Sequence, residues 1–271
     1  MYLEELKILL ENKISPKLFR LNSEFYGFQY GQISKNKLIK KVMITLDLNL
    51  KAIHFAIKSK INLIISYHSL TNKPIKCFNS HIINKLSLLS KYPVLIFVLN
   101  SSYIAAEGGV SDTLMALSYL KLEESFNVKN KKGIDVPIGR ICTPQYLQNE
   151  KGVLTLENLI KRIKHNLGAN QISYVGDLKN IINKICIVGG DMSKTRYLEK
   201  ALKYGCDCYI SGKINHFGSL YAKDMGLNLI EASNYMAETI ALKKLSNLLS
   251  LEFPRDEFLF FESEELIHTY S

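Results

Sequence analysis

Short apolar segments and amphipathic segments alternate along most of this chain. Continuous apolar runs predict buried strands, and apolar residues spaced three and four apart predict helices. The expected strands are residues 41–46, 62–66, 94–99, 185–188, 206–211, 227–231 and 258–261. The expected helices are an amphipathic N-terminal segment and residues 50–58, 80–90, 112–120, 155–167, 194–204, 216–225 and 237–249. Because strands that alternate with helices pair in parallel, the pattern predicts an α/β fold.

Residues 123–152 interrupt this alternation. They hold a patch of lysine and asparagine, two of the six prolines and several glycines, which favours an irregular connection or short strands. The order of strands and helices then resumes. We therefore expect two similar layered α/β units with mixed, mostly parallel sheets. The expected limits are residues 1–125 and 126–271, with C-terminal elements packing back against the first unit.

Composition narrows the class of protein. The 271 residues are 47% hydrophobic with a mean hydropathy of +0.01, which excludes general disorder. The net charge of +10 attracts phosphates, nucleic acid or acidic lipid, although a chain rich in Lys, Asn and Ile acquires such an excess without any binding role. No RNP, helix-turn-helix or zinc-finger pattern is present, so we do not expect nucleic acid as a partner.

The sequence supports neither a membrane protein nor a secreted protein. The longest apolar run, residues 94–99, is far shorter than the ~20 residues that span a bilayer. Glu4 and Glu5 stand where a basic leader is expected, and the five cysteines are an odd number. We therefore expect a cytoplasmic protein with reduced thiols. Cys206 and Cys208 are spaced C-x-C with no second pair nearby, which does not suit zinc.

Polar residues at strand ends are the first candidates for a site. His68 follows the strand expected at 62–66, and ligands of open α/β sheets bind beyond the carboxyl ends of strands. Asn234 and Glu238 are four residues apart, so they share one face of a helix. His68 also suits a satisfied structural histidine, and Glu238 a solvated helix face. The glycine pair in residues 188–195 (VGGDMSKT) lacks both glycines of a P-loop and suits a tight turn or an anion at a helix N-terminus.

Eight short segments together carry a family resemblance along nearly the whole chain. They are 26–31 (YGFQYG), 42–47 (VMITLD), 63–70 (LIISYHSL), 100–112 (NSSYIAAEGGVSD), 139–140 (GR), 187–190 (IVGG), 207–212 (DCYISG) and 231–238 (EASNYMAE). In order and spacing they resemble the Nif-three-like family, also known as GTP cyclohydrolase I type 2 homologs. The resemblance implies the Nif-three-like fold, a two-metal site and a homohexamer.

The chain departs from the family at the metal ligands that the resemblance implies. Two of the family's histidines are replaced by asparagine, one by tyrosine, and a carboxylate by isoleucine. The six positions are Tyr67, His68, Asn100, Ile104, Asn234 and Glu238. Only His68 and Glu238 keep the ligand type, whereas a catalytic zinc alone takes about three protein ligands. We therefore expect a degenerate two-metal centre that binds divalent metal weakly or not at all.

Two functions follow from these expectations. The first is a non-catalytic or altered ligand-binding homo-oligomer, a hexamer by resemblance, that holds a nucleotide or another anionic small molecule. The alternative is a metal-dependent hydrolase that acts on GTP or a related phosphorylated small molecule and uses His68 and Glu238. His216 suits a structural or a site-lining role equally, and the sequence assigns no catalytic residue.

Overall fold

The chain forms two compact units. A computed structural model describes residues 1–21, 24–71, 75–146 and 152–266. The first unit comprises Met1–Tyr103 and Ala241–Ser271, and the second Ile104–Ile240. The sequence predicts a limit after residue 125. The structure places residues 104–125 in the second unit because they contribute a helix and an edge strand to its sheet.

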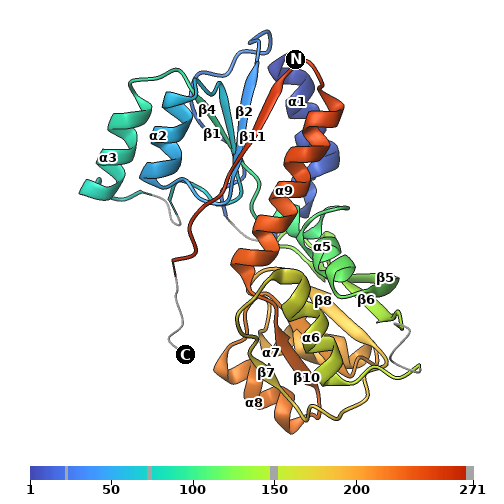
Figure 1. The fold of residues 1–271 in the computed structure, drawn as a ribbon. Helices are drawn as coiled ribbons and strands as arrows, with labels where there is room; N and C mark the ends of the chain where they lie inside the picture. Colours follow the sequence, from blue (N-terminus) through green and yellow to red (C-terminus); the bar gives the residue numbers. More distant parts are fainter. Residues whose placement is uncertain (22–23, 72–74, 147–151, 267–271) are drawn as a thin grey trace. The chain divides into compact units, whose positions relative to one another are not determined.

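A five-stranded sheet, in the order β1-β4-β3-β2-β11, forms the centre of the first unit (Figure 1). Its strands are β1 (Gly27–Tyr30), β2 (Lys41–Thr45), β3 (Leu63–Ser66), β4 (Leu95–Val98) and β11 (Glu257–Phe261). Four of them run parallel, and β1 pairs antiparallel with β4. The parallel strands β2, β3 and β4 therefore end at one edge of the sheet, as the sequence predicted.

Helices cover both faces of this sheet. They are α1 (Leu3–Leu9), which continues into a π-helical turn (Leu10–Ile14) and a 3-10 turn (Lys17–Phe19), α2 (Leu50–Lys58) and α3 (Ser80–Leu89). Figure 1 shows α2 and α3 on one side of the sheet and α1 on the other. Two further helices, α4 (Ser101–Ala105) and α9 (Asn234–Glu252), each begin in one unit and end in the other.

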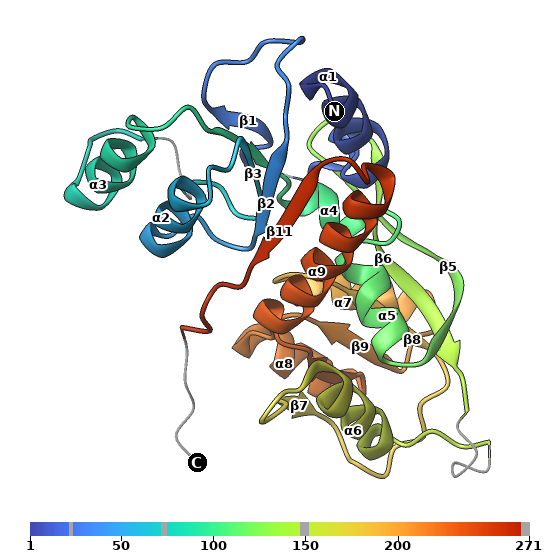
Figure 2. The same ribbon diagram turned by 45° about the horizontal axis from the view of Figure 1, so that its top comes forward.

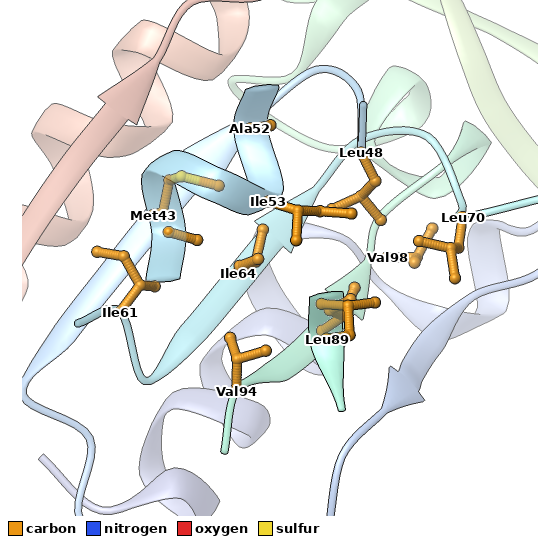
Figure 3. Packing of buried hydrophobic residues seen from close by; sticks show 12 residues of the cluster. Met43, Leu48, Ala52, Ile53, Ile61, Ile64, Leu70, Leu89, Val94 and Val98 are labelled. Carbon is orange, nitrogen blue, oxygen red and sulfur yellow. The ribbon is translucent and has the colours of Figure 1, made fainter. Parts of the chain in front are cut away.

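Apolar side chains from α2, α3 and the parallel strands form the core of this unit (Figure 3). Ile53 of α2 and Leu89 of α3 are fully buried against strand residues such as Ile64. Such β-branched and leucine side chains suit strands that are covered on both faces. Asparagine side chains start both helices, because Asn49 accepts from the Ala52 amide and Asn79 from the Ile82 amide.

The second unit holds a six-stranded sheet in the order β5-β6-β8-β9-β10-β7. Its strands are β5 (Leu120–Lys129), β6 (Asp135–Pro144), β7 (Tyr174–Val175), β8 (Ile185–Val188), β9 (Cys208–Ser211) and β10 (Asn228–Glu231). Its helices are α5 (Val110–Leu117), α6 (Leu156–Leu167), α7 (Thr195–Lys203) and α8 (His216–Asp224). Helix α5 packs on β6 and β8 and against α6, and α7 packs against α8 (Figure 2).

Residues 123–152, for which the sequence favours an irregular connection or short strands, belong mainly to a long antiparallel hairpin of β5 and β6. Strand β5 lies at the edge of the sheet, so its charged residues face solvent and its composition resembles that of a loop. Residues 147–151 of the expected segment lie outside the described part. Both sheets mix parallel and antiparallel pairs, so the predicted two-sheet α/β architecture is confirmed. No helix within the described ranges is long and apolar enough to cross a bilayer.

Candidate functional site

His68 and Asp47 form a hydrogen-bonded pair at the carboxyl edge of the first sheet. His68 follows β3 and Asp47 follows the neighbouring parallel strand β2. The distance between His68 Nδ1 and Asp47 Oδ1 is 2.9 Å, and both side chains are about 40% exposed. The His68 main-chain N–H also donates to the Leu46 carbonyl at 3.0 Å. A carboxylate bound to Nδ1 fixes the orientation of an imidazole ring, as second-sphere carboxylates do in metal and acid–base sites.

Tyr67 and Asn100 lie beside this pair. The buried Tyr67 ring packs edge-on against the His68 ring, with 4.8 Å between the ring centroids. Asn100 follows β4 in the left-handed region, with φ at +50°, a conformation that asparagine adopts more readily than most residues. Its main-chain N–H donates to the Tyr67 carbonyl at 3.0 Å, and its side-chain Nδ2 donates to the Phe25 carbonyl at 2.7 Å. The side-chain amide of Asn100 is thus already hydrogen-bonded to the main chain of another segment.

A buried lysine of helix α3 belongs to the same neighbourhood. Lys85 is 7% exposed and lies on the helix face that also buries Ile82 and Leu89. Burial lowers the pKa of the Lys85 ammonium group, and the nearby Asp47 carboxylate offsets part of that effect. Neither Lys85 nor Asp47 is among the site residues predicted from the sequence. A charged residue at a position where the helical spacing demands an apolar one would have identified Lys85.

In the second unit, Ile104 packs against the glycine turn that follows β8. A Cβ atom added to Gly189 would lie 3.2 Å from Ile104 Cγ2, and one added to Gly190 would lie 2.8 Å from Ile104 Cδ1. Gly190 also has φ at +78°, which favours glycine. The alkyl side chain at position 104 therefore fills the space above a tight turn. Of the two readings of residues 188–195, this packing favours the tight turn.

Asn234 and Glu238 occupy the first two turns of α9. The Asn234 main-chain N–H donates to the Gly212 carbonyl at 3.0 Å, while its side-chain Oδ1 is buried with no hydrogen-bond partner among the described residues. Glu238 is only 4% exposed, so the solvated helix face considered from the sequence is wrong. His216 is exposed at the first position of α8, where its ring contacts Phe217.

The six positions divide between the units. Tyr67, His68 and Asn100 belong to the first unit, and Ile104, Asn234 and Glu238 belong to the second. No group of three His, Cys, Asp or Glu side chains in the described ranges is arranged to hold a metal ion.

A surface cavity of about 590 Å³ lies in the first unit, at the opposite edge of the sheet from His68. It is lined by residues around the end of β1, the end of α3 and the start of β4, among them Tyr30, Lys37, Lys91 and Tyr92. Because β3 and β4 are parallel, the entry end of β4 and the carboxyl end of β3 are on different edges. The cavity is therefore separate from the His68 cluster.

Comparison with known proteins assigns the family. The family model described as Duf34/NIF3 (NGG1p interacting factor 3) matches residues 1–265. This chain belongs to the NIF3 family. The resemblance seen in the sequence motifs is thereby confirmed.

Two curated relatives match most of the chain. A Clostridium perfringens protein named GTP cyclohydrolase 1 type 2 homolog is 30% identical over 255 residues, which cover 91% of each chain. A Methanocaldococcus jannaschii protein of the same name is 27% identical over 241 residues, covering 87% of this chain and 90% of the relative.

Solved structures show the same fold. Staphylococcus aureus protein SA1388 superimposes with a TM-score of 0.80 at 21% identity, covering 100% of this chain and 99% of that one. Reduced HcgD from Methanocaldococcus jannaschii gives 0.77 at 23% identity, covering 96% and 97%. At these identities the likeness establishes the architecture alone.

Proposed function

We propose that this NIF3-family chain has a degenerate two-metal centre and acts as a non-catalytic or altered ligand-binding homo-oligomer. The donor chemistry at the six family positions carries the proposal. Two divalent ions held about 3.5–4 Å apart need several anionic or imidazole donors in common. The chain offers one imidazole, one carboxylate, two amides, a phenol and an alkyl group. This set does not fit a pair of zinc-like ions, so no hydrolytic step is derived through them.

Local contacts support the same conclusion. Asn100 directs its Nδ2 to the Phe25 carbonyl, which makes it a hydrogen-bond donor there. Ile104 is buried against Gly189 and Gly190, where it offers no electron pair. The net charge of +10 favours an anionic ligand, for which a nucleotide or another phosphorylated small molecule is our choice. Self-association, as a hexamer, rests on the family resemblance.

A metal-dependent hydrolase acting on GTP or a related phosphorylated molecule is the second candidate. The His68–Asp47 hydrogen bond favours it, because a carboxylate that orients imidazole suits both metal ligation and general-base catalysis. The burial of Glu238 is a second feature that suits a site residue. The curated relatives carry the name GTP cyclohydrolase 1 type 2 homolog.

Metal analysis and a turnover assay on the same preparation distinguish the two candidates. The protein is purified without chelator, its metal content is measured by plasma mass spectrometry, and it is incubated with GTP before and after addition of divalent metals. We expect far less than one metal ion per chain and no turnover. A matched variant carrying His68→Gln and Glu238→Gln should give the same metal content. Two ions per chain in the wild type, lost in the variant and accompanied by GTP hydrolysis, would refute the proposal.

A further inference from the structure

We propose that the cavity at the amino edge of the first sheet, where its parallel strands begin, binds a small molecule that carries both a phosphate group and a planar ring, such as a nucleoside monophosphate. The cavity has a volume of about 590 Å³, and small-molecule sites in proteins measure roughly 300–1,000 Å³. Because the cavity is separate from the six family positions, the inference goes beyond the proposed function and does not depend on whether a metal binds there.

Two buried apolar side chains and two tyrosines line the cavity. Leu89 and Val94 are almost completely buried and belong to the core cluster shown in Figure 3. Tyr30 and Tyr92 are half-buried and pack against the same cluster. Tyrosine rings that are held by packing offer flat apolar surface on which a planar ring stacks.

A β-bulge places Tyr30 on the cavity side of the sheet. Phe28 of β1 pairs with Phe97 of β4, and the two rings are in contact. Tyr30 pairs with Ile96, so β1 advances two residues where β4 advances one. Ile96 belongs to the core cluster of α2 and α3, on the opposite face from Phe97. Residues 28 and 30 of a regular strand would share a face, so the bulge is what brings Tyr30 to the face of α3.

The charge around the cavity favours an anion. Its lining includes Lys37 and Lys91 and no acidic residue. Residues 25–106 contain eleven lysines and a single acidic residue, Asp47. Asp47 follows β2 at the carboxyl edge of the sheet, where it binds His68. Among the described residues, neither Lys37 nor Lys91 forms an ion pair. Two ammonium groups at one cavity therefore attract a phosphate, to which lysine binds as a point charge.

The acidic residues of the neighbouring helix α1 do not cancel this charge. Helix α1 is bonded to the loop that lines the cavity, because the Leu3 N–H donates to the Lys37 carbonyl at 2.9 Å. Glu4 lies 3.9 Å from a lysine ammonium group of the same helix. Glu5 accepts from the main-chain N–H at the start of the helix at 2.7 Å. Neither glutamate lines the cavity.

Calorimetric titration of the full-length protein with AMP tests the site. Lys37→Met and Lys91→Met each remove one charge and keep an unbranched side chain. Lys58→Met is the matched control, because Lys58 is exposed at the end of α2 in the same unit and does not line the cavity. We expect the affinity for AMP to fall about tenfold in each of the first two variants and to stay unchanged in Lys58→Met.

A third variant separates the cavity from the general charge of the unit. Ser34 lines the cavity and is exposed, so Ser34→Trp fills part of the volume without changing the charge. We expect this variant to lose AMP binding. Adenosine and inorganic phosphate, titrated separately into the wild type, should each bind more weakly than AMP, because each engages only one part of the site.

Four results would overturn the inference. They are a wild type that does not bind AMP, an equal loss of affinity in Lys58→Met, unchanged affinity in Ser34→Trp, and a short oligonucleotide that binds more tightly than AMP and depends on the same lysines. Crystals of the wild type grown with AMP give a direct answer, since density beside Tyr30 and Tyr92 supports the inference and density elsewhere refutes it. Metal content tests the proposed function independently, and none of these results alters that test.

Discussion

Arg140 bonds the segment that begins the second unit to the sheet of that unit. Replacing Arg140 with methionine should therefore destabilise the second unit strongly. Its side chain lies in β6 with 5% of the residue exposed, and it pairs through Nε with the Asp112 carboxylate of α5. The remaining guanidinium donors bond four main-chain carbonyls at 2.8–3.3 Å, those of Pro137, Gly139, Ala105 and Ala106.

Removing one member of a buried ion pair costs about 3–5 kcal/mol, because the other charge stays buried without its partner. In Arg140→Met the Asp112 carboxylate would retain the Gly108 main-chain N–H at 2.7 Å. The four carbonyls would lose a donor at the same time. We therefore expect a loss near 4 kcal/mol, which is a large share of the roughly 5–15 kcal/mol that stabilises a typical domain.

Hydrogen exchange followed by mass spectrometry measures this effect within one unit. Peptides that cover β6 and β8 should exchange faster in Arg140→Met, while peptides from β2 and β3 should not change. Arg255→Met is the matched control, since Arg255 is exposed and a surface change costs within about 0.5 kcal/mol. In the double variant Arg140→Met with Asp112→Asn, the loss should be smaller than the sum of the single losses. A loss under about 1 kcal/mol for Arg140→Met would refute this account of the pair.

Three further predictions concern glycine packing, thiol reactivity and the dependence of stability on pH. Gly212→Ala should lower the melting temperature, at a cost of about 1–3 kcal/mol, because the new Cβ would overlap Asn234 Oδ1 and would lie 3.1 Å from the Gly190 nitrogen. An unchanged melting temperature would contradict this prediction. Ellman's reagent should modify the exposed Cys77 rapidly and the four buried cysteines only after unfolding. Burial raises the pKa of Cys142 and of Cys206 to about 12, which keeps these thiols protonated. Rapid reaction of all five cysteines would refute this prediction. The pKa values of Cys142 and Cys206 exceed the ordinary value of 9.0, so the stability that these two buried thiols contribute is complete below pH 9. This stability should be lost as pH rises from about 9 through 12. Urea unfolding across that pH range would measure the loss.

Most of the fold was predictable from the sequence because its buried strands are continuous runs of apolar residues. Strands such as β3 and β8 are buried on both faces, so nearly all of their residues are apolar. Strand β5 breaks that rule, since an edge strand exposes one face and carries charges there. Strand β1, GFQY, is short and only half-buried, so nothing in its composition separates it from a loop.

The candidate site was predictable only in part, for a different reason. Placing His68 at the end of a strand needs only the order of elements, which the sequence contains. The bond from His68 to Asp47 depends on the register of β2 against β3, and periodicity does not encode register between distant segments. Lys85 was overlooked because a lysine in an amphipathic helix is usually assigned to the solvent face.

Residues at the positions of the proposed degenerate centre make contacts of their own, and these contacts would oppose substitution by metal ligands. A histidine at position 100 would have to give up the hydrogen bond from Asn100 to the Phe25 carbonyl. An aspartate at position 104 would bury a carboxylate against the Gly189–Gly190 turn, at a cost that only a bound cation could offset. Each such substitution is therefore unfavourable before any metal binds, and a single substitution that fails to gain metal says nothing about the wild type. Metal content and anion binding are decisive only when measured on the chain as it stands.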